Sequence, residues 1–369
     1  MRIAFDHQIF ALQRYGGISR YLSRVVEELI YAGEDPRVFA PFHRSGYLAQ
    51  LPKGTVRGQE FPRFPAKTTR AFLALNQLAS APGMRRWRPH VVHETYYTRA
   101  SSRVKGAALI LTVHDMIHEI CRADFAANDP TSATKRLAVS RADHIICVSN
   151  STRRDLIAHF DVPEHRTSVV HLGVDLPIEG DGAPIAPVVE GRPFLLFVGI
   201  RAGYKNFDGF LHAVADSSTL RGALDVVAFG GGAFTRKETT LIESLGMSDR
   251  VTHTSGDDKM LAAHYAQAAG LVCPSRYEGF GLPPLEAMAH GCPVICSDVS
   301  SLPEVVGDAA ELFDPRDRAA MAAAIERVVT SPSRRHALID RGYRRARALT
   351  WERCARETLA VYQSVVGGS

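Results

Sequence analysis

The sequence predicts an α/β protein with two doubly wound domains, each a parallel sheet with helices on both faces. The chain has 369 residues, of which 46% are hydrophobic, enough for two domains with separate cores. Short apolar segments rich in β-branched residues recur in both halves, and segments with helical periodicity separate them. Strands that are apolar throughout are typical of parallel sheets covered on both faces.

The predicted strands form two series with predicted helices between most of them, for example over residues 18–32 and 151–159. In the first half the strands cover residues 2–6, 37–41, 90–94, 109–115, 144–149 and 168–173. In the second half they cover residues 194–199, 224–230, 250–255, 270–275 and 293–298.

A segment rich in proline, glycine and acidic residues separates the two series, which is typical of a linker. We therefore predict an N-terminal domain over residues 1–177, a linker over 178–193 and a C-terminal domain over 194–349. A last helix is predicted over 350–369. Its buried face is predicted from apolar residues at helical spacing, namely Trp351, Ala355, Leu359, Tyr362 and Val366.

The charge distribution and the composition limit the partners and the cellular setting that we expect. Residues 1–180 hold 24 Lys and Arg against 17 Asp and Glu, so the net positive charge lies in the first half. This excess predicts either an ordinary solvated face or a surface that meets anionic lipid or a phosphorylated acceptor. Nucleic acid is not expected, because the basic residues are not interleaved with aromatic ones. No apolar run is long enough for a membrane span, and the six scattered cysteines favour a reduced, cytoplasmic setting.

The stretch SRYEGFGLPPLEAMAHGCPVICSD, residues 275–298, carries the strongest functional signal. Glu278 lies in a glycine-rich loop, and Glu286 lies at the start of the helix that follows. Glycines allow main-chain N–H groups to approach a ligand, and a helix N-terminus favours anions. Two carboxylates beside such a terminus predict a ligand with both phosphate and hydroxyl groups, such as a sugar nucleotide.

Three further groups of residues follow predicted strands. Gly16 and Gly17 precede a helix, where they form either an anion-binding turn or a simple connection. Arg201 and Lys205 follow the first strand of the second domain, as diphosphate ligands or as solvated loop cations. Polar residues also end three strands of the first domain, where we predict a cleft lining; they are His7, His93, Glu94, His114 and Asp115. No motif for a metal site or a serine hydrolase is present.

The stretch at 275–298 resembles the E-x7-E signature of family-four retaining glycosyltransferases, which have the two-domain GT-B fold. The similarity extends over nearly the whole chain, through the early double glycine, TVHD, CVSNSTRRDL, VVHLGVD, VGIRAGYKN and the last helix. It implies that the two domains face a cleft and that the last helix crosses back to the first domain.

The resemblance also implies a role for each matching residue. Glu278 is expected to bind hydroxyls of the donor sugar and Glu286 the ribose hydroxyls. The backbone of Phe280, Gly281 and Leu282 is expected to contact sugar and phosphate. Arg201 and Lys205 are expected to bind the diphosphate, which the backbone of Gly16 and Gly17 approaches from the other domain, and His114 is expected to face the donor hexose. Neither a metal nor another cofactor is implied.

The similarity is to mannosyl- and deoxymannosyl-type transferases of bacterial surface polysaccharide and lipopolysaccharide synthesis. It implies a GDP-linked sugar as donor, with UDP- and dTDP-linked sugars as alternatives, and a saccharide or lipid-linked saccharide as acceptor. Acceptor specificity is expected in the loops at 43–70 and 116–132. The expected location is the cytoplasm, at the inner face of the inner membrane. A sugar-nucleotide epimerase of the same architecture and a non-catalytic binding protein are the alternatives.

Overall fold

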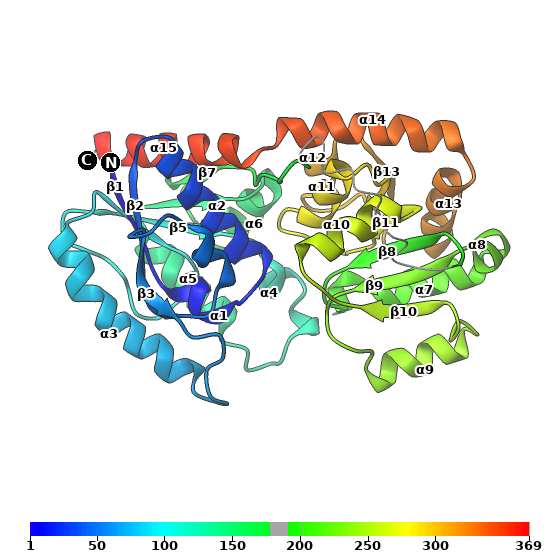
Figure 1. Cartoon of the computed structure of the whole chain (residues 1–369), viewed down its shortest axis with the longest axis horizontal. Helices are drawn as coiled ribbons and strands as arrows, with labels where there is room; N and C mark the ends of the chain where they lie inside the picture. The colour runs from blue at the N-terminus through cyan, green and yellow to red at the C-terminus, as the bar shows by residue number, and fades with distance from the viewer. Residues whose placement is uncertain (178–190, 202, 369) are drawn as a thin grey trace. The chain divides into compact units, whose positions relative to one another are not determined.

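The computed structural model describes residues 1–177, 191–201 and 203–368 (Figure 1). The chain forms two compact units. The N-terminal unit consists of Met1–Gly173 together with Trp351–Ser369, and the C-terminal unit consists of Val174–Thr350. Residues 178–190 of the predicted linker lie outside the described residues.

The N-terminal unit contains a seven-stranded parallel sheet with the order β3-β2-β1-β4-β5-β6-β7. Its strands are β1 (Arg2–Phe5), β2 (Asp35–His43), β3 (Val56–Glu60), β4 (Val91–Glu94), β5 (Ala108–Val113), β6 (His144–Cys147) and β7 (Thr167–Val169). Its α-helices are α1 (Gln8–Leu12), α2 (Gly17–Tyr31), α3 (Thr69–Trp87), α4 (Ile117–Ile120), α5 (Thr131–Arg141), α6 (Asn150–Phe160) and α15 (Trp351–Gly367).

The C-terminal unit contains a six-stranded parallel sheet with the order β10-β9-β8-β11-β12-β13. Its strands are β8 (Phe194–Val198), β9 (Asp225–Phe229), β10 (Val251–Thr254), β11 (Gly270–Cys273), β12 (Val294–Ser297) and β13 (Ala310–Phe313). Its α-helices are α7 (Phe207–Asp216), α8 (Ser218–Ala223), α9 (Arg236–Ser244), α10 (Asp258–Gln267), α11 (Leu282–Ala289), α12 (Leu302–Val306), α13 (Arg318–Val329) and α14 (Pro332–Ala348).

Both sheets are doubly wound, since strand order reverses beside β1 and beside β8. All eleven predicted strands are present, and the prediction missed two more. β3 is an edge strand with four of its five residues exposed, so it has no apolar signal. β13 is an edge strand of the second sheet. It contains Glu311, which forms ion pairs with Arg327 and Arg334. The sequence of β13, AELF, has no β-branched residue, so it lacks the signal from which the other strands were predicted.

The last helix, α15, packs on α2 and β5 within the N-terminal unit. Its buried face is formed by Trp351, Cys354, Ala355, Thr358 and Tyr362, whereas two of the residues predicted for that face, Leu359 and Val366, are only half-buried. The helix therefore completes the fold of the unit in which the chain begins. None of the described helices is both long enough and apolar enough to cross a membrane.

A buried chain of polar groups fixes α15 to the sheet. Nδ1 of His93 lies 2.5 Å from the Tyr362 hydroxyl, and its Nε2 lies 2.9 Å from the Thr112 hydroxyl. The Thr112 hydroxyl is in turn 3.3 Å from the hydroxyl of Tyr21 on α2. Burial, and then the neighbouring His114, lower the pKa of His93 to about 3, so its imidazole is neutral at physiological pH.

Replacing Tyr362 by Phe should destabilise the N-terminal unit by about 1–3 kcal/mol, because Nδ1 of the buried His93 loses its partner. Both tryptophans of the chain, Trp87 and Trp351, belong to this unit, so tryptophan fluorescence in a urea titration reports its unfolding. The matched control is Tyr343→Phe on α14, where the side chain is 40% exposed. An equal urea midpoint for Tyr362→Phe and wild type would contradict the prediction.

The N-terminal unit should also lose stability as the pH falls from about 6.5 to 5. His93 and His114 have folded pKa values of about 3 and about 4, so in this range the unfolded chain takes up protons that the folded unit does not. The loss approaches about 1.4 kcal/mol per pH unit for each histidine. The raised pKa of Glu94 acts with the opposite sign. The histidine effect is therefore measured as the difference in pH slope between wild type and His93→Gln, and equal slopes would refute it.

Candidate functional site

The loop between β11 and α11 holds the signature residues of the C-terminal unit. Gly281 precedes α11 with a φ of +108°, and a Cβ atom there would lie 2.8 Å from Leu302 Cδ2. Only glycine therefore fits this turn without strain. Pro283 and Pro284 follow in the first turn, where their missing N–H groups break no helical bond. The chain thus passes from the end of β11 to the start of α11 through a loop of eight residues.

Glu278 is held firmly in this loop. Its side chain is 10% exposed, and its Oε1 accepts hydrogen bonds from Lys205 Nζ at 2.7 Å and from Ser275 Oγ at 2.6 Å. Its backbone N–H donates to Ser300 Oγ, and Ser301 Oγ lies within hydrogen-bond distance of the carbonyl oxygens of Glu278 and Phe280. These contacts fix the backbone and one carboxylate oxygen, and the side-chain bonds from the described residues fall on Oε1.

Lys205 reaches Glu278 because the two loops leave neighbouring strands. It ends a single 3₁₀ turn, Gly203–Lys205, that follows β8, and β8 pairs with β11. Burial by itself lowers the pKa of a lysine, but the adjacent Glu278 carboxylate raises the pKa of Lys205 above its ordinary value. The ammonium group is therefore charged at any physiological pH. It has three N–H donors, of which the bond to Glu278 uses one.

Glu286 lies deeper than the sequence suggested. We predicted a residue at the exposed start of a helix, whereas its side chain is only 6% exposed on the second turn of α11. Its Oε2 accepts a 2.9 Å hydrogen bond from the hydroxyl of Tyr265, which is itself buried on α10. The neighbouring helix thus orients this carboxylate, and sequence spacing gave no sign of that.

Arg201 is occupied by the protein itself. Its Nε donates to Glu238 Oε1 at 2.6 Å, and its two terminal nitrogens donate to the carbonyls of Gly230, Gly232 and Ala233. The guanidinium is 3% exposed. The glycines at 230–232 all have φ between +74° and +86°, so Arg201 stabilises a turn that other residues adopt only with strain. The hydrogen bonds of Arg201 go to Glu238 and to this turn, and not to the Lys205–Glu278 pair.

His114 directly follows β5 in the N-terminal unit and lies among aromatic rings. Its ring stacks with Tyr96 and meets Tyr21 edge-on, at centroid distances of 6.4 and 5.9 Å. Burial lowers the pKa of His114 to about 4, and the adjacent Asp115 offsets only part of this effect. The neutral ring has a buried Nε2 with no hydrogen-bond partner within the described ranges.

Gly16 and Gly17 form the N-terminus of α2, as predicted. Gly16 is the residue before the helix, which begins at Gly17 and runs for 15 residues. The Gln13 side chain accepts a hydrogen bond from the backbone N–H of Ser19 in the first turn. A Cβ atom on Gly16 would lie 2.5 Å from Gln13 Oε1, so glycine permits this close approach.

The predicted cleft lining at other strand ends is wrong for two residues. His93 is fully buried in the hydrogen-bonded chain beneath α15. Glu94 is also fully buried, where it forms an ion pair with Arg141 at 2.6 Å and accepts from the backbone of Ser102. Both residues stabilise the fold, because buried polar groups in a sheet need partners.

Four residues of the site were missed by the sequence reasoning. Ser275, Ser300 and Ser301 follow β11 and β12 at the same sheet edge, so their position after strands was an available signal. Tyr265 had no such signal, since a tyrosine at that place in a helix suggests only packing.

Within the part of the chain that the structure describes, no group of three or more His, Cys, Asp or Glu side chains is placed to hold a metal ion.

Comparison with known proteins agrees with this geometry. Residues 15–177 match the family model described as Glycosyltransferase Family 4, and residues 184–345 match the model described as Glycosyl transferases group 1. The chain is 29% identical to O-antigen chain mannosyltransferase B of Escherichia coli, over 94% of this chain and 96% of the relative.

Solved structures show the same fold. Sucrose-phosphate synthase from Thermosynechococcus elongatus matches with a TM-score of 0.78 at 21% identity, covering all of both chains. The Anabaena protein HepE, in complex with UDP-glucose, matches with a TM-score of 0.74 at 16% identity, covering 99% of this chain and all of that one. The two matched families, the two parallel-sheet units and these neighbours together show that the chain belongs to the family-four glycosyltransferases and is a hexosyltransferase with the GT-B fold.

Proposed function

We propose that this enzyme transfers a mannose-type hexose or deoxyhexose from a GDP-linked sugar to a saccharide or lipid-linked saccharide, with retention of anomeric configuration. The process it serves is the synthesis of bacterial surface polysaccharide or lipopolysaccharide. The observation that carries the proposal is the Lys205–Glu278 pair beside the N-terminus of α11, with the Glu286 carboxylate further along that helix. The mannose preference is supported by the relative that acts in O-antigen synthesis.

In the proposal the sugar end of the donor is bound by Glu278 and its ribose end by Glu286. Glu278 has Oε2 available for sugar hydroxyls, since the contacts from described residues fall on Oε1. The N–H groups from Phe280 to Leu282 begin α11, where the helix dipole favours a phosphate. Glu286, oriented by Tyr265, suits the vicinal diol of a ribose, because a carboxylate accepts from two hydroxyls at once. In this proposal Gly16, Gly17 and His114 act on the donor from the N-terminal unit.

The charge that develops on the departing diphosphate needs a cation. Lys205 supplies it, with two N–H donors beyond the one that binds Glu278. Arg201 adds positive charge at the same sheet edge, and its direct role is to hold the glycine turn at 230–232. We propose that these cations do the work that a metal ion does in other transferases, and that the enzyme needs no metal or other cofactor.

Retention follows in the proposal from attack on the same face as the departing group. The signature carboxylate Glu278 is assigned to hydroxyl binding, and it is already paired with Lys205. The leaving phosphate then accepts the proton of the acceptor hydroxyl while the new glycosidic bond forms.

The alternative to a GDP-linked donor is UDP-glucose, the nucleotide sugar bound in the HepE structure.

We include peripheral contact with an anionic membrane in the proposal. Helix α3 exposes Leu75 and Leu78 to 50% and 73%, and the same helix ends with Arg85 and Arg86. Apolar and cationic side chains on one helix suit the surface of anionic lipid.

The function is tested by incubating the full chain with GDP-mannose, UDP-glucose or dTDP-rhamnose and a mannoside acceptor. Release of nucleoside diphosphate that depends on the acceptor, highest with GDP-mannose and unchanged by excess EDTA, is expected. The anomeric configuration of the product is read by NMR. An epimerase would convert the nucleotide sugar without an acceptor, and a binding protein would convert nothing. Loss of activity in EDTA that Mg²⁺ restores would remove metal independence from the proposal.

Replacing Glu286 by Gln should weaken binding of the nucleoside diphosphate by about 10- to 100-fold, since a charged acceptor for two hydroxyls is lost. Glutamine keeps an oxygen for the Tyr265 hydroxyl, so the fold of α11 should be retained. The binding constant is measured by calorimetry, with Glu243→Ala on the exposed side of α9 as the control. An unchanged constant would remove Glu286 from the site.

Replacing Lys205 by Ala should lower kcat by about 100-fold or more, because a cation next to the departing charge is lost. The control is Lys237→Ala, a lysine that is 85% exposed in the same unit. Nucleoside diphosphate binding should fall less than kcat, since the bound product carries less of the developing charge than the transition state. A decrease in kcat of less than about threefold would show that Lys205 does not face the leaving group.

A further inference from the structure

Five residues other than glycine have a positive φ in the part of the chain that the structure describes. Three belong to the N-terminal unit, and two of these, Arg88 and Asp161, end the helices α3 and α6, where the left-handed conformation is common. The other two are Asn206 and Ser300 of the C-terminal unit, with φ values of +54° and +55°. Each follows a strand at the sheet edge that carries the ion pair of the candidate site. Residues held in such conformations cluster at functional sites.

Asn206 directly follows Lys205 and shapes the turn that carries this lysine. Its backbone N–H donates to the carbonyl of Gly203 at 3.0 Å, which closes the 3₁₀ turn Gly203–Lys205. Its own carbonyl accepts from the N–H of Phe210 at 3.1 Å and so begins α7. The left-handed residue is therefore the point at which the chain changes from the turn to the helix.

The side chain of Asn206 fixes this turn to a distant part of the sheet edge. The residue is 4% exposed, and its Nδ2 donates to the carbonyl of Pro315 at 2.9 Å, in the loop after β13. Strands β11 and β12 lie between β8 and β13 in the sheet, so one buried hydrogen bond joins loops of strands that are not neighbours. A Cβ atom on Gly209 would lie 2.4 Å from Asn206 Oδ1, so glycine in the first turn of α7 leaves room for the amide.

Ser300 holds the other partner of the ion pair. Its Oγ accepts a 2.9 Å hydrogen bond from the backbone N–H of Glu278, and it reaches this N–H from the loop between β12 and α12. A serine adopts the left-handed conformation only at a cost, because its Cβ crowds the following carbonyl oxygen. Glycine would adopt the same backbone without that cost, but it would leave the Glu278 N–H without this acceptor.

We propose that Asn206 and Ser300 are positioning residues that hold Lys205 and Glu278 in place for the transfer reaction. The proposal rests on the proposed function, in which Lys205 stabilises the departing diphosphate and Glu278 binds the donor sugar. Asn206 and Ser300 act through the backbone that they fix, and neither needs to touch the donor. A displacement of about 1 Å at a reacting centre lowers a rate by up to about 100-fold, so small shifts of these loops suffice.

The test compares Asn206→Gly and Ser300→Gly with wild type, because glycine keeps the left-handed backbone and removes only the side chain. We expect kcat for sugar transfer to fall about tenfold in each variant, and the donor KM to change less than kcat does. The matched control is Asp161→Gly, which replaces a left-handed residue at the end of α6 and should leave kcat unchanged. Circular dichroism in urea checks that each variant is folded. Asn206→Asp and Ser300→Ala serve if a glycine variant does not fold.

A purely structural effect is separated by repeating both substitutions in the Lys205→Ala chain. If Asn206 and Ser300 act through the ion pair, each should lower the already reduced kcat by less than about twofold there. An equal factor in both backgrounds would overturn the proposal, because the two residues would then act independently of Lys205.

A second measurement needs no donor. Acetic anhydride modifies uncharged amines; burial by itself lowers the pKa of Lys205, but the adjacent Glu278 carboxylate raises it above its ordinary value. Lys205 should therefore be acetylated slowly in wild type. In both glycine variants, where the pair is loosened, acetylation should be about tenfold faster, the change that one pKa unit produces. Mass spectrometry of the peptides gives the rates, with the exposed Lys105 as internal reference.

Equal acetylation of Lys205 in wild type and both folded variants would overturn the proposal. If acetylation changes as expected but wild type transfers no sugar, the proposed function fails and the positioning of the ion pair remains. If wild type transfers sugar and the folded variants have its kcat, only the positioning role fails.

Discussion

The parallel pairing of β8 with β11 is the constraint on which the site of the C-terminal unit depends. Because both strands end at the same sheet edge, the loops that follow them place Lys205 and Glu278 2.7 Å apart, although 72 residues separate them in the chain. The ion pair keeps the lysine charged and orients one carboxylate oxygen of Glu278, and in the proposed function the other oxygen binds hydroxyls of the donor sugar. A doubly wound sheet creates such an edge by its topology, and the residues placed there acquire a function.

Polar residues at strand ends fall into two groups in this protein, according to how far their hydrogen bonds are satisfied. His93 and Glu94 are enclosed and have their hydrogen bonds satisfied by Tyr362, Thr112, Arg141 and Ser102, so they act as structural ties. Glu278 and Lys205 retain some exposure, 10% and 14%, and retain unused hydrogen-bonding capacity. Saturation of hydrogen bonds, more than residue type, separates structural polar groups from those able to bind a ligand. By the same measure Arg201, with four of its five N–H donors used on Glu238 and three carbonyls, mainly holds the glycine turn at 230–232.

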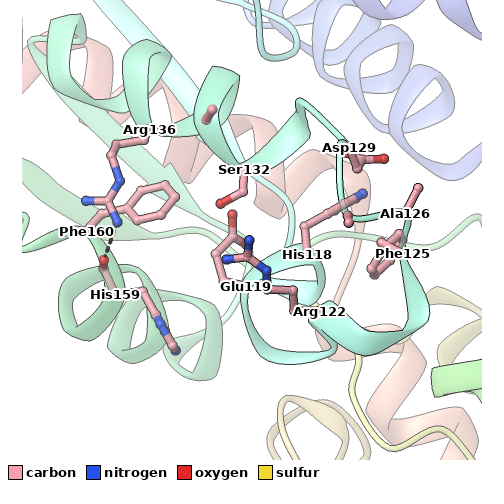
Figure 2. Close-up of a pocket in the computed structure, with 12 residues that line it drawn as sticks. His118, Glu119, Arg122, Phe125, Ala126, Asp129, Ser132, Arg136, His159 and Phe160 are labelled. Atoms are coloured by element: carbon pink, nitrogen blue, oxygen red, sulfur yellow. Dashed lines mark hydrogen bonds between the residues drawn. The ribbon is translucent and has the colours of Figure 1, made fainter.

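Glu119 is a buried carboxylate of the N-terminal unit that pairs with a buried lysine, and it is one of the residues that line the pocket shown in Figure 2. Its ion pair with Lys135 offsets part of the cost of burying its charge, and its Oε1 has no hydrogen-bond partner among the residues that the structure describes. Lys135 also donates to the carbonyl of Asp115, so it links Glu119 to the residues that follow β5.

The sequence alone determined the fold class, eleven of the thirteen strands among the described residues and the identity of the signature residues, because these depend on local periodicity, on glycine and proline at turns and on motif spacing. The strands β3 and β13 were not predicted, since β3 is mostly exposed and β13 has no β-branched residue. Only the tertiary structure decided which polar residues are partners. Lys205 with Glu278, Tyr265 with Glu286 and Lys135 with Glu119 each lie on different elements. Whether a polar side chain is buried and satisfied or left available depends on strand order and helix packing, which bring distant residues together and leave no trace in local sequence.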